Sequence, residues 1–171
     1  IDPSHLYGAE YYTNSITFEG GTELVLTGNQ RTGINAVLGA GGRITGTVTL
    51  QGEVLVSNAT LTFYAQHASS WEIVSTQTVT QTGRYDSGAL LPGIYRICGV
   101  TWLSGSNSQL VGCYGGSMTV DGATDVVIVA GETQANQEIS LGDGQFDGAI
   151  AGVVTANSVP VAGIEVGLYT Y

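Results

Sequence analysis

The chain has 171 residues, of which 26 are glycine and 43% are hydrophobic, enough for about one to two compact domains. Fourteen acidic residues stand against four arginines and no lysine, so the net charge is −10. This charge argues against partners such as nucleic acid or an anionic membrane surface, and no apolar run approaches the ~20 residues that a membrane span needs.

The hydrophobic pattern predicts an all-β chain. Apolar and polar side chains alternate along most of the sequence, and no stretch shows a helical stripe. Strands are predicted at residues 44–50, 59–65, 72–80, 94–100, 117–120 and 125–129. Short strands separated by glycine pairs are typical of an antiparallel, immunoglobulin-like β-sandwich.

Parts of the sequence recur at an offset near one hundred residues. SITFEGGTELVL (15–26) matches SMTVDGATDVVI (117–128), with an apolar residue, an acid, glycine and threonine in the same order. Residues 41–49 and 58–65 similarly match 148–155 and 161–169. This offset is the size of one small sandwich domain.

The repeat predicts three parts. We expect residues 1–41 to be the closing strands of a preceding sandwich unit and residues 42–141 to be a complete unit. Residues 142–171 would be a linker and the opening strands of a following unit. The sequence opens at Ile1 without a signal peptide, so we expect either that processing removed one or that the chain is an internal portion of a longer protein.

Four motifs follow one another in the middle unit: Gly42-Ile44-Gly46-Val48, Ala59-Leu61-Phe63, Gly83-Tyr85 and Leu91-Pro92-Gly93-Tyr95. In this order they resemble the repeats of the carboxypeptidase regulatory-like family, close to the Cna B-type and transthyretin-like sandwiches. The resemblance implies a β-sandwich with an accessory, stalk or surface-display role rather than an enzyme. Cna B-type domains often carry a lysine–asparagine crosslink, which a chain without lysine cannot form.

The stretch from Gly83 to Gly99 predicts core packing rather than a working site. Leu91-Pro92-Gly93-Ile94 has the residues of a type II turn, with glycine at the position of positive φ. In the strand that follows, Tyr95 and Ile97 share one face, which we assign to the core. Tyr85 is the matching core aromatic, and a sugar-stacking role for it is the alternative.

Cys98 and Cys113 are predicted to form a disulfide that ties a hairpin. The chain is glycine-rich, lacks lysine and has the character of an exported protein, where such bonds persist. Two free thiols are the alternative, and zinc is disfavoured because no histidine lies nearby.

Candidates for catalysis are few. The histidines are His5 and His67, and Ser69, Ser70 and Glu72 near His67 do not amount to a triad by sequence adjacency alone. We therefore expect that the chain is not an enzyme.

Asp143 and Asp147 lie among glycines in the joint between predicted units. A calcium ion bound there is one interpretation, and solvated linker acids are the other. No further cofactor is expected.

Exposed aromatic residues remain as candidates for contact with a glycan or another surface protein: Trp71, Trp102, Tyr7, Tyr11 and Tyr12. The alternative is that they cover the ends of a sandwich.

Two functions are consistent with these features. The first is an extracellular or cell-surface structural protein that forms a filament, stalk or surface layer. Its head-to-tail neighbours, either subunits of a homo-oligomer or neighbouring repeat units, would complete each other's open strand edges. The second is a non-catalytic carbohydrate- or protein-binding module of the adhesin type.

Overall fold

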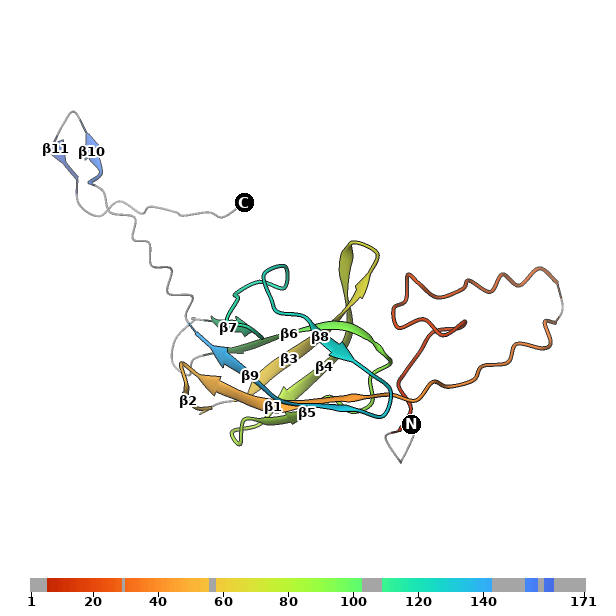
Figure 1. Cartoon of the computed structure of the whole chain (residues 1–171). Coiled ribbons are helices and arrows are strands. Elements are labelled where there is room, and N and C mark those ends of the chain that lie inside the picture. The colour runs from red at the N-terminus through yellow and green to blue at the C-terminus, as the bar shows by residue number, and fades with distance from the viewer. Residues whose placement is uncertain are drawn as a thin grey trace.

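The computed structural model describes residues 6–28, 30–55, 58–102, 109–142, 153–156 and 159–161. All regular secondary structure in this part is β-strand, and two sheets face each other in a sandwich (Figure 1). The all-β prediction is therefore confirmed. The described residues include no helix long and apolar enough to cross a membrane.

The first sheet is built around β1 (Arg43–Leu50). β1 pairs antiparallel with β2 (Glu53–Val54) and β5 (Arg84–Asp86), and parallel with β9 (Thr133–Leu141). Among the described strands this is the one parallel pair, and the other strand pairs are antiparallel, as expected. Because β9 follows β8 in the opposite sheet, it returns across the sandwich and aligns with β1 along nearly all of that strand.

The second sheet contains five antiparallel strands. Their order is β4 (Ser70–Val79), β3 (Ala59–His67), β6 (Gly93–Trp102) and β7 (Gln109–Cys113), and β8 (Val126–Ile128) also pairs with β6. A separate antiparallel pair joins β10 (Thr155–Ala156) and β11 (Val159–Pro160).

One core lies between the sheets. Alternate side chains of facing strands are buried in it, including Phe63, Ile97 and Ile139. Tyr95, Ile97 and Tyr85 are buried, which confirms their predicted place and leaves the Tyr85 ring inaccessible to a sugar. The Tyr95 hydroxyl donates to the Leu91 carbonyl four residues upstream at 2.7 Å, the local arrangement of a tyrosine corner.

The predicted strand at 117–120 was wrong. These residues form turns instead, because the Ser117 side chain and carbonyl bond the local backbone: its hydroxyl accepts from the Thr119 N–H at 3.1 Å and its carbonyl accepts from the Cys113 N–H at 2.7 Å. Over so short a stretch, these local hydrogen bonds decide the conformation, although the side chains alternate as in a strand. By contrast, β1, β3, β4, β6 and β8 lie within or around the other predicted ranges.

The predicted type II turn at residues 91–94 was also wrong. Gly93 does not have positive φ, and it is already the first residue of β6. Here glycine serves for its small size, since a Cβ at Gly93 would lie 3.0 Å from the Ile16 Cδ1.

The N-terminal segment, residues 6–42, contains no named strand among its described residues. It has isolated bridges at Tyr7–Ala40, Tyr11–Ser15 and Gly42–Leu90. In Figure 1 it runs out beyond one end of the sandwich as the red-to-orange trace and returns to enter β1. Its assignment to a preceding sandwich unit stays a prediction.

Candidate functional site: an N-terminal segment that repeats a sandwich loop

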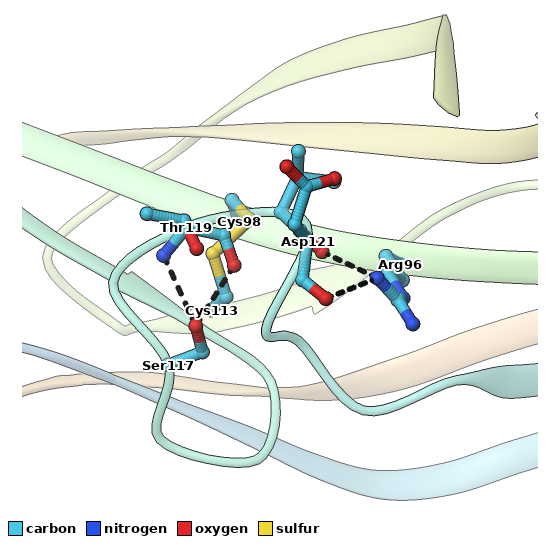
Figure 2. Close-up of a disulfide and its surroundings, with 7 residues drawn as sticks. Arg96, Cys98, Cys113, Ser117, Thr119 and Asp121 are labelled. Atoms are coloured by element: carbon cyan, nitrogen blue, oxygen red, sulfur yellow. Dashed lines mark hydrogen bonds between the residues drawn. A yellow bond between two sulfur atoms is a disulfide. The ribbon is translucent and has the colours of Figure 1, made fainter. Parts of the chain in front are cut away.

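The connection between β7 and β8 is the sandwich loop with which the N-terminal segment is compared. It starts at the disulfide between Cys98 and Cys113, which are directly opposite each other on β6 and β7 (Figure 2). The predicted disulfide is therefore confirmed. Cys113 donates its N–H to Ser117 rather than across the ladder, and a non-hydrogen-bonded pair of this kind brings the two strands close enough for the bond.

Arg96 on β6 holds this connection in place. Its Nε donates to the Asp125 carboxylate at 2.6 Å, and its NH1 donates to the carbonyls of Val120 and Asp121 at 2.8 and 2.7 Å (Figure 2 draws the Asp121 contact). Its guanidinium also stacks over the Trp71 ring at 4.2 Å from the centroid. Arg96 is thus the main polar anchor of the loop on the outer face of the sheet, a role that the sequence analysis did not assign.

The N-terminal segment contains the same turn at an offset of 102 residues (117 minus 15). In the sandwich, the Ser117 hydroxyl donates to the Thr119 carbonyl and accepts from the Thr119 N–H. In the N-terminal segment, the Ser15 hydroxyl makes the same two bonds to Thr17.

Three backbone hydrogen bonds of the two loops match at the same offset. The matched pairs are Tyr11 N to Ser15 O (2.8 Å) with Cys113 N to Ser117 O (2.7 Å), Gly21 N to Phe18 O (3.0 Å) with Ala123 N to Val120 O (3.2 Å), and Thr22 N to Tyr12 O (3.0 Å) with Thr124 N to Tyr114 O (2.9 Å). Residues 11–22 therefore have the local fold of residues 113–124.

Backbone conformation extends this match. Gly115 and Gly116 have positive φ, and the corresponding Thr13 and Asn14 have φ of 71° and 63°. Threonine seldom adopts such a conformation, so the hydrogen bonds around it must hold it there. The sequence repeat was the signal for this site, although it did not reveal that a non-glycine pair takes the left-handed conformation.

The strand after the loop differs between the two copies in burial. In β8, Val126 and Ile128 are buried, with exposed fractions of 5% and 2%. The residues 102 positions earlier are Leu24 and Leu26, with exposed fractions of 39% and 74%. The N-terminal copy thus has a sandwich loop and strand sequence without the sheet that buries it.

The N-terminal loop also packs on the end of the sandwich. Ile16 lies against the core beside Gly93, and Thr17 is 1% exposed. The corresponding residues of the second loop are Met118, which is half-buried, and Thr119, which is exposed. Thr17 is therefore more deeply buried than its counterpart in the second loop.

The predicted aromatic contacts lie in two places. Trp71 is under the Arg96 guanidinium, and Trp102 is 58% exposed at the end of β6. Tyr7, Tyr11 and Tyr12 belong to the N-terminal segment, where Tyr11 meets Phe18 edge-on at 5.6 Å. Tyr11 and Tyr12 also line a shallow pocket with Glu19 and Glu23.

His67 and its neighbours in the β3–β4 hairpin do not have triad geometry. His67 Nδ1 lies 2.8 Å from the Glu72 carboxylate, but the Ser70 hydroxyl donates to the backbone carbonyl of His67. His5, Asp143 and Asp147 lie outside the described residues, so calcium binding stays a prediction. Among the residues that the structure describes, no group of three or more acidic, histidine or cysteine side chains is placed to hold a metal.

Comparison with protein-family models gives no match, and comparison with curated proteins gives no significant match. The resemblance to carboxypeptidase regulatory-like and Cna B-type repeats therefore remains a prediction from the sequence motifs.

Proposed function

We propose that this chain is part of an extracellular structural protein made of tandem β-sandwich units, which assembles head to tail into a filament, stalk or surface layer. The observation that carries the proposal is the match between residues 11–26 and residues 113–128. One copy completes a sandwich, and the other has its apolar strand residues exposed.

The confirmed disulfide supports the proposed location. Disulfides persist in oxidising surroundings, and Cys98–Cys113 closes a loop with a sequence separation of 15. Cell-surface arrays also need stiff units, and this bond together with the Arg96 anchor fixes the long β7–β8 connection to β6.

Strand completion between neighbours accounts for the exposed N-terminal segment. Residues 6–40 correspond to β7–β9 at the observed offset, and residues 148–171 correspond to β1–β3 by the sequence repeat. These two segments together lack counterparts of β4–β6. The neighbour that completes the segment must therefore supply these strands, from an adjoining unit of the polypeptide or from another subunit.

Electron microscopy of undenatured material at neutral pH tests this function. The proposal predicts extended fibres or a regular lattice with an axial spacing near one sandwich length, roughly 4 nm for about twelve strand residues. Uniform isolated particles at the concentrations found at the cell surface would contradict it.

A binding module is the second candidate, favoured by the exposure of Trp102. An indole at the end of a sheet offers a platform for a sugar ring or a partner's apolar residue. Glycan-array binding that is lost in Trp102→Ala and kept in Trp71→Phe would support this function. Absence of binding by the unmodified chain would remove it.

A further inference from the structure

We propose that residues 11–26 form a docking segment whose partner is the β1–β6 half of another sandwich of this repeat, and that an arginine on the partner's β6 strand anchors it. The inference rests on the proposed tandem function and names the surface and the chemistry by which one unit is completed. The partner is a sandwich sheet whose β8 position is vacant.

The docking segment already holds a set of polar acceptors for an arginine. In the complete unit, Arg96 is bound by two carbonyls and one carboxylate, those of Val120, Asp121 and Asp125. The residues 102 positions earlier are Phe18, Glu19 and Glu23, so the segment offers two carbonyls and a carboxylate in the same order. The three matched backbone bonds mean that the loop has the same shape before any partner binds.

The chemistry of these acceptors selects a guanidinium. A planar, always charged group with several N–H donors bonds to a carboxylate and two carbonyls at once, which a single ammonium group does less well. Glu23 is one methylene longer than Asp125, so its carboxylate reaches as far as Asp125 does and allows some adjustment.

The strand that follows the loop supplies apolar side chains for the partner's core. In the complete unit, Val126 and Ile128 enter the core while Val127 faces outward, and β8 is paired with residues 93–95 of β6. Leu24 and Leu26 occupy the two inward positions and Val25 the outward one, so the alternation is preserved. Burial of Leu24 and Leu26 therefore requires a strand equivalent to β6 beside them.

A complete second copy of the sandwich is an unfavourable partner, because the docking segment would have to displace that copy's own β8. Its β6 already pairs with β8, and the Cys98–Cys113 bond ties the β7–β8 connection to that strand. Tyr11 stands at the position of Cys113, so the docking segment has no equivalent covalent link. The partner is hence a unit that lacks its own β8.

The direct test adds such a partner to the full chain. Residues 42–102 are placed immediately before Ile1, because position 103 corresponds to position 1 at the observed offset, and Cys98 of the added copy is replaced by alanine. Hydrogen exchange is then followed at Leu24 and Leu26 by mass spectrometry or NMR. We expect their amides to exchange at least about 100-fold more slowly than in the unmodified chain.

Two variants of the added copy examine the arginine. Replacing its Arg96 by alanine is expected to reduce the protection at Leu24 and Leu26 by at least about tenfold, whereas replacing its exposed Arg84 by alanine should leave the protection unchanged. Equal effects of the two substitutions would overturn the role of the guanidinium. Fast exchange at Leu24 and Leu26 in the extended chain would overturn the docking proposal.

Exchanging one loop for the other within the chain gives an independent measurement, which does not require the added copy of residues 42–102 to fold. In the full chain, residues 114–128 are replaced by residues 12–26, which keeps Cys113 and its disulfide. We expect a sandwich in which the amides of β6 remain protected and the Arg96→Ala change still lowers that protection. Loss of β6 protection in this variant would contradict the proposal, whereas fibre formation by native material tests the proposed function separately.

Discussion

At the scale of single residues, Arg96 connects more parts of the molecule than any neighbouring charge does. Its side chain is 16% exposed and joins Asp125, the turn at residues 120–121 and the Trp71 ring. The other described ion pair of an arginine, Arg43 with Asp86 at 3.2 Å, has the more exposed arginine, 37% against 16%, and such exposed pairs contribute little to stability.

Arg96→Ala should therefore lower the free energy of unfolding by about 2 kcal/mol, because carbonyls and a carboxylate lose a charged donor. Arg96→Lys should recover only part of this loss, since an ammonium cannot reach all three acceptors together. Denaturant unfolding with the disulfide intact measures both. The matched control is the exposed Arg84→Ala, for which a change within about 0.5 kcal/mol is expected. Equal losses at the two positions would contradict the anchoring role.

Two buried tyrosines should make the fold sensitive to alkaline pH. Burial raises the pKa of Tyr85 and of Tyr95 well above the ordinary value of 10.0, and the charge of Tyr114 adds to the effect at Tyr85. Both hydroxyls also donate to backbone carbonyls, a bond that ionisation removes: Tyr85 to Gln137 at 2.8 Å and Tyr95 to Leu91 at 2.7 Å.

The sign follows from the protons bound in each state. Above pH 10 the unfolded chain loses these two protons while the folded chain keeps them, so stability falls as pH rises, by up to about 1.4 kcal/mol per pH unit for each tyrosine. Below pH 10 they add no pH dependence. Thermal unfolding between pH 8 and 11.5 should show this fall, with a shallower slope in Tyr85→Phe and Tyr95→Phe. An unchanged slope in both variants would contradict the assignment.

At the scale of elements, the sequence predicted the strands whose inward faces are strongly apolar. The alternation around Phe63 and around Tyr95 and Ile97 was enough to locate β3, β6 and their core residues. β9 was missed because its first half is polar and mostly exposed, so alternation is visible only near Ile139 and Leu141. The turn at Ser117 was missed because hydroxyl bonds to the backbone are not visible in a period-two pattern.

The candidate site was only half predictable. The repeat of residues 15–26 in 117–128 was readable directly, and it located the N-terminal segment. The Arg96 anchor was not readable, because Asp125 lies 29 residues away and meets Arg96 only through the folded β7–β8 connection.

Gly46 tests the parallel pairing of β1 with β9. A Cβ at this position would overlap the backbone of Gln137, opposite the register shift between the strands. Gly46→Ala should therefore destabilise the sandwich by about 1–3 kcal/mol, as overpacking does. Thr47→Ala, an exposed neighbour on β1, is the control, and hydrogen exchange at Ile139 and Leu141 is the local measurement. A neutral Gly46→Ala would show that β9 does not approach β1 this closely.

The disulfide stabilises the β6–β7 hairpin. With a sequence separation of 15, Cys98–Cys113 should contribute about 3 kcal/mol to the free energy of unfolding. A reductant is expected to lower the denaturant midpoint of the unmodified chain and to leave the double variant Cys98→Ser, Cys113→Ser unchanged. If reduction does not alter the unmodified chain, the bond does not contribute to its stability.

At the scale of the whole molecule, the sandwich and the N-terminal segment differ in the exposure of their apolar residues. The sandwich encloses a continuous core, whereas the segment exposes large apolar side chains: Phe18, Leu24, Val25, Leu26, Val37 and Leu38. In a chain with a net charge of −10, a row of exposed apolar residues next to a preformed loop is a feature of an interaction surface. The proposed head-to-tail completion by another unit would account for the exposure and for the repeat together.

Hydrogen exchange on native, undenatured assemblies tests this account most directly, with the peptide that covers residues 24–26 compared to the one that covers 126–128. If neighbouring units complete this segment, the first peptide exchanges rapidly in the isolated chain and as slowly as the second in the assembly, because both strands then lie beside a β6 partner. Rapid exchange of residues 24–26 in the assembly, with 126–128 protected, would contradict the claim that neighbouring units complete this segment.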